Sequence, residues 1–134
     1  MLQKQSRIDI CDKSGGLVLR IFQVYKKSRN IAKVGSNVRG SLQSVVMKSK
    51  RITSKLQKRG GLFIKKGTKF YARIAGTRYP IVYIDGSVLR FSKNFCVLFY
   101  RLGGSPVNSK GYYNFFTTRR AGGLKFTSRF KLCI

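Results

Sequence analysis

The chain has 134 residues, of which 29 are Lys or Arg and three are Asp or Glu, so its net charge is +26. Histidine is absent, which excludes a Ser-His-Asp triad, a Cys-His nucleophile and His-dependent acid–base catalysis. A charge of this size on one compact chain indicates a polyanionic partner, and nucleic acid is the natural candidate because bound cations release counterions from phosphates.

The length and a hydrophobic content of 43% predict a single domain, residues 1–134, with a modest core. We expect no enzymatic activity and no cofactor, since the acids are scattered and nothing marks a Lys or Tyr as a catalyst. Cys11, Cys96 and Cys133 lie far apart without a CxxC pair, which predicts free thiols and no metal site. No apolar stretch approaches the ~20 residues that span a bilayer, so no membrane partner is expected.

The N-terminal part, residues 1–46, contains three segments typical of strands. A turn cluster of Asp, Ser and Gly separates the first two segments, and the basic stretch Lys26 to Lys33 predicts a loop or wide hairpin before the third. The three segments, rich in apolar and β-branched residues, are Leu2 to Ile10, Leu17 to Tyr25 and Val38 to Val46.

Residues 47–61 form a basic arm with almost no apolar side chains. Taken alone, such a segment fits a solvated loop equally well. Given the charge of the whole chain, we favour an arm that becomes ordered on RNA. Its candidate RNA-binding residues are Lys48, Lys50, Arg51, Lys55, Lys58 and Arg59.

The stretch 62–100 organises the chain, because short apolar runs alternate in it with breaks of Gly, Asp, Ser and Asn. Such runs predict strands joined by tight turns, and hence a small antiparallel sheet or barrel. Asp85-Gly86 is the sharpest signal and predicts a two-residue primed turn, since Gly accepts positive φ. The runs are Phe70 to Ala75, Ile81 to Ile84, Val88 to Phe91 and Phe95 to Tyr100.

The C-terminal part, residues 101–134, is predicted to be rich in loops. Phe115 to Arg120 would begin a short helix that Gly122-Gly123 ends early. Leu124 to Ile134 alternates, as a closing strand or an extended tail does. Aromatic side chains beside cations fit either core packing, which we favour, or stacking on unpaired bases. These aromatics are Tyr112, Tyr113, Phe115 and Phe116.

Several short motifs follow one another in a definite order. They are the opening LQKQSRIDICDKSGG, Val34-Gly35, Ile64-Lys65-Lys66-Gly67, Thr77-Arg78-Tyr79-Pro80, Asp85-Gly86-Ser87, Arg90-Phe91 and Asn94. In a basic chain of this size, that order resembles the L-fourteen family of large-subunit ribosomal proteins over nearly the whole length. The departures are Lys13 and Ser36 in place of Asn and an acid, an expanded segment 47–62, and an eroded arginine-rich helical segment near the end.

The resemblance implies an all-β fold: a small five-stranded β-barrel with a projecting hairpin and a short, degenerate C-terminal helical or extended segment. Residues 1–46 and 62–100 would supply the barrel strands. The family binds large-subunit rRNA at the subunit interface and contacts small-subunit rRNA across a bridge. Large-subunit proteins three and nineteen would be its neighbours, and a ribosome silencing factor would find a surface on it.

The composition, the lost acids and the start MLQKQSR, which shows no presequence, resemble those of an organelle-encoded mitochondrial ribosomal protein. A plastid or the bacterial cytoplasm is the alternative location. Two other functions compete with the ribosomal one: a free single-stranded RNA-binding or RNA-chaperone barrel, and an RNA-modifying enzyme.

Further cations outside the arm are predicted to contact RNA phosphates, which would position the protein without reading sequence. Those near the core are held by turns and strand ends, and the others lie near the two termini. They are Lys65, Lys66, Arg73, Arg78 and Arg90 near the core, Lys4, Arg7 and Lys13 near the N-terminus, and Arg119 and Arg120 near the C-terminus.

Overall fold

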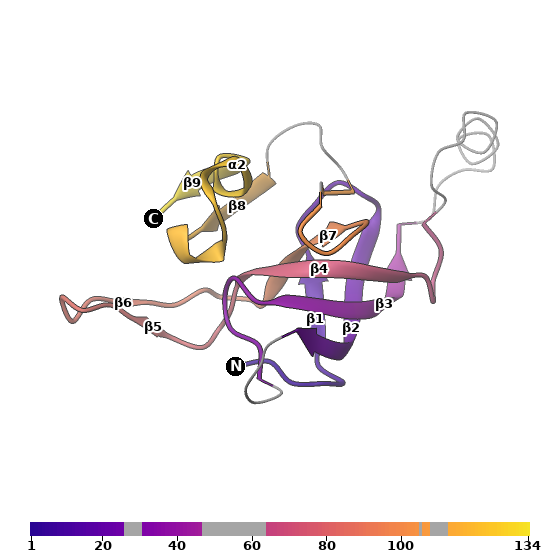
Figure 1. Ribbon diagram of the computed structural model, residues 1–134, viewed down its shortest axis with the longest axis horizontal. Helices are drawn as coiled ribbons and strands as arrows, with labels where there is room; N and C mark the ends of the chain where they lie inside the picture. The colour runs from indigo at the N-terminus through magenta and orange to yellow at the C-terminus, as the bar shows by residue number, and fades with distance from the viewer. Residues whose placement is uncertain (26–30, 47–63, 105, 108–112) are drawn as a thin grey trace.

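The computed structural model describes residues 1–25, 31–46, 64–104, 106–107 and 113–134 (Figure 1). Five strands close a barrel in the order β1-β2-β3-β4-β7, which confirms the predicted five-stranded barrel. The barrel strands are β1 (Arg7–Ile10), β2 (Gly16–Tyr25), β3 (Asn37–Val45), β4 (Lys69–Gly76) and β7 (Phe95–Phe99).

Neighbouring strands of the barrel are antiparallel except at one seam. There β1 runs parallel to β7, with Asp9 opposite Phe95 and Ile10 opposite Cys96. This pairing joins the first strand to the last, so the barrel leaves no free sheet edge.

Alternating apolar side chains fill the barrel. In β4, Phe70, Ala72 and Ile74 point inward and are at most 4% exposed, while Tyr71 and Arg73 are partly exposed. This period of two is what a strand with one buried face requires. The inward cluster also includes Ile8, Leu19, Ile21, Val38, Leu42, Cys96 and Leu98.

Strand β7 is buried along its whole length, which explains its unbroken apolar sequence. Cys96 and Leu98 belong to the barrel interior. Phe95, Val97 and Phe99 belong to a second cluster, formed with residues near the C-terminus. The two faces of β7 therefore serve two cores.

The second core is built by residues 113–134, here called the C-terminal lobe. Its elements are β8 (Tyr113–Thr117), a 3₁₀ turn η1 (Arg119–Ala121), a one-turn helix α2 (Leu124–Thr127) and β9 (Phe130–Cys133). Strands β8 and β9 pair in parallel, outside the barrel (Figure 1).

The predicted short helix from Phe115 to Arg120 is wrong, because this stretch ends β8 and begins η1. Its strand conformation depends on distant partners: β9 pairs with it, and the buried Thr117 hydroxyl donates a 2.9 Å hydrogen bond to the carbonyl of Ala75. The alternating segment after Leu124 combines the helical turn α2 with the strand β9.

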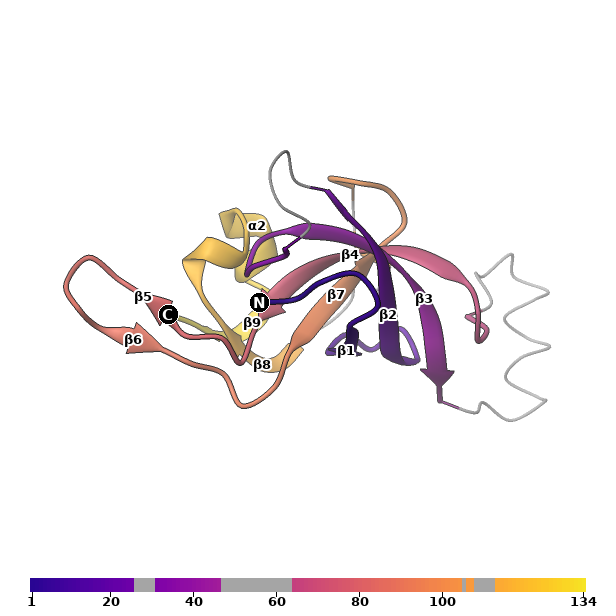
Figure 2. The ribbon, with the colours of Figure 1, turned by 90° about the horizontal axis from the view of Figure 1, so that it is seen from below.

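Strands β5 (Ile81–Val82) and β6 (Val88–Leu89) form a hairpin that projects from the barrel (Figure 1). Figure 2 shows this hairpin and the C-terminal lobe toward the same end of the molecule. The predicted projecting hairpin is confirmed, but its turn differs from the predicted two-residue primed turn.

The hairpin loop has three residues, Ile84, Asp85 and Gly86. The Gly86 amide donates to the Tyr83 carbonyl (3.1 Å), and the Tyr83 amide donates to the Ser87 carbonyl (2.9 Å). Only Gly86 has positive φ, at 82°, whereas a type I′ turn would require it at Asp85 as well. The Asp85 carboxylate instead accepts hydrogen bonds from the amide and hydroxyl of Ser87, which stabilises an ordinary turn.

The buried acid Asp12 links two parts of the barrel. Its carboxylate accepts hydrogen bonds from the Ser14 amide (2.9 Å) in the β1–β2 turn and from the Leu98 amide (2.8 Å) in β7. Burial raises the pKa of Asp12, and these hydrogen bonds oppose the rise.

The cysteines are free thiols, and Cys11 and Cys96 are buried. The Cys11 thiol donates to the Cys96 carbonyl at 3.3 Å, and burial raises the pKa of both thiols. In the described residues, His, Cys, Asp and Glu side chains nowhere gather as a metal site would need, and no helix is long and apolar enough to cross a membrane.

Candidate nucleic-acid interface

The cations of this chain far outnumber its acids, and two of the acids have structural tasks. Asp12 and Asp85 accept hydrogen bonds from backbone amides and a serine hydroxyl. Asp9 lies in β1, half-buried. Three acids cannot neutralise 29 Lys and Arg residues, so most of the positive charge is not neutralised within the chain.

The outer face of the barrel carries a pair of like charges. Arg7 of β1 lies directly opposite Arg20 of β2, and both side chains are exposed. Like charges opposite one another on neighbouring strands destabilise a sheet, so this pair favours an anion between or above the two guanidinium groups. Arg7 was predicted from the sequence. Arg20 was not, although its outward position follows from the alternation of β2.

Lys4 and Lys13 are exposed in the loops on either side of β1, and Lys65 and Lys66 are exposed in the turn before β4. Gly67 takes φ of 87° in that turn. The predicted arm residues Lys48, Lys50, Arg51, Lys55, Lys58 and Arg59 lie outside the described residues.

Arg73 lies between the barrel and the C-terminal lobe. Its Nε donates to the Asn37 side-chain oxygen at 3.0 Å, and its guanidinium carbon is 5.5 Å from the Phe99 ring centre and 5.4 Å from that of Phe126. Such stacking fixes the orientation of the cation while leaving its charge unneutralised.

A cavity of about 380 Å³ brings Arg73 together with Arg129. Gly103 and Gly104 also line it. Within the described part of the chain, Nη1 of Arg129 is buried without a hydrogen-bond partner. Two guanidinium groups at one cavity indicate an affinity for anions. Arg129 was missed in the sequence because only its tertiary position gives it this role.

Arg78 and Arg90 meet at the base of the hairpin. The Arg78 amide donates to the Asn94 side-chain oxygen at 2.8 Å, and Nε of Arg90 donates to the Arg78 carbonyl at 3.1 Å. Both side chains are exposed. The structure therefore brings together two predicted residues that are 12 positions apart in the sequence.

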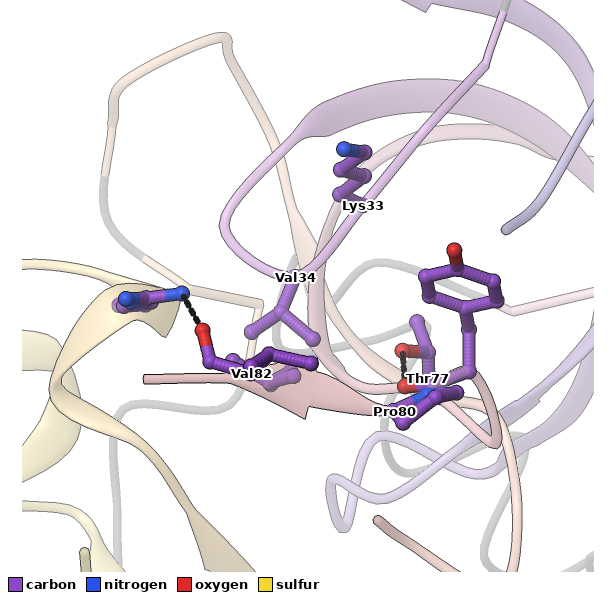
Figure 3. A pocket seen from close by; sticks show the side chains of 8 residues that line it. Lys33, Val34, Thr77, Pro80 and Val82 are labelled. Atoms are coloured by element: carbon purple, nitrogen blue, oxygen red, sulfur yellow. Dashed lines mark hydrogen bonds between the residues drawn. The ribbon is translucent and has the colours of Figure 1, made fainter. Parts of the chain in front are cut away.

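Arg120 joins the C-terminal lobe to the hairpin. Its guanidinium carbon lies 4.6 Å from the centre of the Tyr83 ring. Its Nη1 donates to the Val82 carbonyl at 3.4 Å, the hydrogen bond dashed at Val82 in Figure 3. The neighbouring Arg119 is exposed in the same 3₁₀ turn. Arg120 thus has a positioning role besides its predicted contact with RNA.

The backbone of Arg120 is also held against the barrel. Gly35 lies directly under its carbonyl oxygen, where a Cβ atom would collide, and Gly35 has φ of 85°. Only glycine satisfies both the close approach and the left-handed backbone at this position. The Val34-Gly35 motif therefore fixes the segment before β3 against the C-terminal lobe.

A second cavity, of about 310 Å³, opens beside the hairpin base (Figure 3). Residues from three separate parts of the chain form it: the segment before β3, the start of the hairpin, and η1. The lining residues are Lys33, Val34, Thr77, Tyr79, Pro80, Ile81, Val82 and Arg120. Neither Lys33 nor Tyr79 was among the predicted RNA-binding residues.

The C-terminal aromatics divide between core and surface. Tyr113 is 1% exposed and packs on Phe130, with 5.0 Å between ring centres, so it belongs to the core as we favoured. Phe116 is half-exposed on β8. Tyr112 and the side chain of Phe115 lie outside the described part.

Two comparisons with known proteins point to the same family. The sequence model of the family described as ribosomal protein L14p/L23e matches residues 1–108. The large ribosomal subunit protein uL14m of Nyctotherus ovalis is 35% identical to this chain over 137 aligned positions, which cover the whole of both proteins. The family match includes the entire barrel and the hairpin and ends before the C-terminal lobe.

Proposed function

Because this chain belongs to the ribosomal protein L14p/L23e family, which confirms the resemblance of its motifs, we propose that it is a structural constituent of the large ribosomal subunit that binds large-subunit rRNA. The observation that carries the RNA-binding part is the set of paired, unneutralised cations on the barrel, at the hairpin base and in the C-terminal lobe. Arg7 with Arg20, Arg78 with Arg90, and Arg73 with Arg129 each form a pair from separate elements.

The mechanism is one of positioning. Strands and turns place the backbone of each arginine pair. The Arg73 side chain is also held by Asn37 and the Arg90 side chain by the Arg78 carbonyl, so these two lose little side-chain freedom when phosphates bind. Contacts with phosphate carry no sequence information, so the RNA would be recognised by its folded shape. No catalytic step and no cofactor belong to this role.

The finer parts of the proposal rest on the family resemblance and on the relative's name. The protein would lie at the face of the large subunit that meets the small one, with proteins three and nineteen beside it and a small-subunit rRNA bridge across from it. A ribosome silencing factor would dock on the same face. We infer a mitochondrial ribosome and an organelle-encoded gene, and an arm at residues 47–61 that becomes ordered on RNA.

Sucrose-gradient sedimentation of a native mitochondrial lysate, with this protein followed by mass spectrometry, tests the proposal. We expect the protein in the fractions of the large subunit, and we expect it to remain there after a high-salt wash that removes loosely bound factors. Recovery near the top of the gradient would contradict the proposal and favour a free RNA-binding barrel.

A further inference from the structure

The cavity beside the hairpin base has an apolar floor open to solvent. Val34 comes from the segment before β3, and Pro80, Ile81 and Val82 come from the start of the hairpin (Figure 3). Val82 is 61% exposed, and Tyr79, which also lines the cavity, is 47% exposed. An aromatic ring and aliphatic side chains that share one open cavity favour a ligand with a flat apolar surface.

Two cations border this apolar floor. Lys33 is exposed, and Arg120 uses one N–H on the Val82 carbonyl, which leaves further donors of its guanidinium group for a ligand. None of the three acids lines the cavity: Asp85 is at the hairpin tip, and Asp9 and Asp12 are in or next to β1. The charge around the apolar floor is therefore positive.

The cavity is held open by contacts that the ligand need not make. The Thr77 hydroxyl donates to the Tyr79 carbonyl at 3.2 Å, which fixes the backbone that presents the Tyr79 ring. Arg120 is fixed from two sides, by the Tyr83 ring and by the backbone approach at Gly35. A site built this way loses little conformational entropy on binding.

Size and chemistry together select the ligand. Ligand cavities in proteins commonly hold about 300 to 1,000 Å³, so a cavity of about 310 Å³ suits one small ring system. A simple anion would not need the apolar floor, and an aliphatic side chain of a neighbouring protein would not need two cations. An unpaired nucleotide has both an apolar ring and a phosphate.

We propose that this cavity receives one unstacked nucleobase of RNA, which stacks on Tyr79 over the floor of Val34, Pro80 and Val82, with its phosphate between Lys33 and Arg120. This inference rests on the proposed function, because large-subunit rRNA would supply the nucleotide. Arg78 precedes Tyr79 in the chain and would hold the phosphate of a flanking nucleotide.

Ultraviolet crosslinking tests the inference in purified large subunits that contain the full-length chain. After irradiation, the RNA is digested with nucleases and the protein with trypsin, and nucleotide adducts are mapped by mass spectrometry. Cleavage after Arg78 and Arg90 gives a peptide that starts at Tyr79. We expect a mononucleotide adduct on this peptide, and fragment ions that place it at Tyr79.

A matched pair of variants gives the specificity of the adduct. Tyr79 is 47% exposed and Tyr100 is 46% exposed, but Tyr100 does not line the cavity. In subunits assembled with Tyr79→Leu we expect the adduct on the 79–90 peptide to fall by about tenfold, from the loss of base stacking. In subunits assembled with Tyr100→Leu we expect it to be unchanged. Equal losses in both variants would overturn the proposal.

The other outcomes separate this inference from the proposed function. Adducts confined to other peptides of a subunit-bound protein would refute the base site and leave the ribosomal role intact. A crosslink from the 79–90 peptide to a neighbouring protein would show a protein side chain in the cavity, which also refutes the base site. Absence of the protein from the large subunit would refute both.

Discussion

The barrel and the C-terminal lobe pack on opposite faces of the same strand, β7, yet they are built differently. The barrel uses five strands of 4 to 10 residues, each with two hydrogen-bonded neighbours, around an interior of alternating apolar side chains. The lobe uses a two-stranded sheet, one turn of helix and a chain of aromatic contacts, in which Phe126 touches Phe99 at 5.9 Å and Phe130 at 5.4 Å between ring centres. The barrel is therefore specified by local pattern, while the lobe depends on the surface that the barrel provides.

The same difference appears in the candidate sites. The barrel by itself, without the lobe, presents cations on its outer face, as at Arg7 and Arg20. Both cavities require the lobe as well, because Arg129 joins Arg73 at one of them and Arg120 completes the other. The lobe therefore completes the two cavities, which the basic barrel would not form by itself.

The largest effect is expected inside the barrel. Phe70 is 4% exposed, and Phe70→Ala should lower the free energy of unfolding by about 3–5 kcal/mol through lost burial and an unfilled cavity. Denaturant unfolding measures this. Val88→Ala, at a 60% exposed hairpin position, is the control and should change the stability by less than about 0.5 kcal/mol. Similar losses in both variants would contradict the assignment of the core.

A Phe→Ala substitution in the lobe should destabilise the lobe and leave the barrel folded. Phe126→Ala removes a ring that contacts Phe99, Phe130 and Arg73, and we expect a loss of about 1–3 kcal/mol. Amide hydrogen exchange should speed up across β8 and β9 and stay slow in β2 and β3. Equal deprotection of all four strands would mean that lobe and barrel unfold as one unit.

Removing the arginines at the hairpin base should weaken RNA binding and leave the fold intact. A plot of log affinity against log salt concentration has a negative slope. In the double variant Arg78→Gln, Arg90→Gln the magnitude of this slope should fall by about 1.5, as expected for two lost phosphate contacts. The measurement is binding of the full chain to large-subunit rRNA at several salt concentrations. The Arg→Lys pair keeps both charges and should retain the slope. An unchanged slope in the Gln variant would place these side chains away from phosphate.

The smallest effect concerns Asp12 and Asp85, whose pKa values are shifted in opposite directions. Burial raises the pKa of Asp12, so folding favours its protonated form, and wild type should gain stability relative to Asp12→Asn as the pH falls from 7 toward 4. Hydrogen bonds from Ser87 lower the pKa of the exposed Asp85, so its contribution is present above its ordinary pKa and is lost as the pH falls through the lowered value. Thermal unfolding at several pH values should therefore show that the stability of wild type relative to Asp12→Asn and its stability relative to Asp85→Asn change with pH in opposite directions. Changes in the same direction would contradict the account.

The sequence predicts the barrel because its strands have local sequence patterns that are typical of strands. Alternation in β4, the turn residues between β1 and β2, and the apolar run of β7 all agree with the structure. In the lobe, β9 lies within the predicted closing strand, but β8 was not predicted, because it becomes a strand only through its pairing with β9 and the contact of Thr117 with Ala75. The hairpin loop was predicted wrongly for a local reason: the Asp85 carboxylate accepts hydrogen bonds from Ser87, and Gly86 is the one loop residue with positive φ.

The candidate site divides in the same way. Arg73, Arg78 and Arg90 were predicted, the latter two from motifs, and each is held by a contact between separate elements. Arg20, Lys33 and Arg129 were missed, because their roles come from a neighbour across a strand pair or a cavity. A count of charges predicts a polyanionic partner, but only tertiary structure tells which cations lie together.

The most direct test of the central claim is an electron-density map of the assembled large subunit at side-chain resolution. The account predicts rRNA phosphates within hydrogen-bonding distance of Arg78, Arg90 and the Arg73–Arg129 cavity, around a barrel whose interior is closed to RNA. Guanidinium groups that instead face solvent, or pair with the carboxylates of a neighbouring protein, would contradict it.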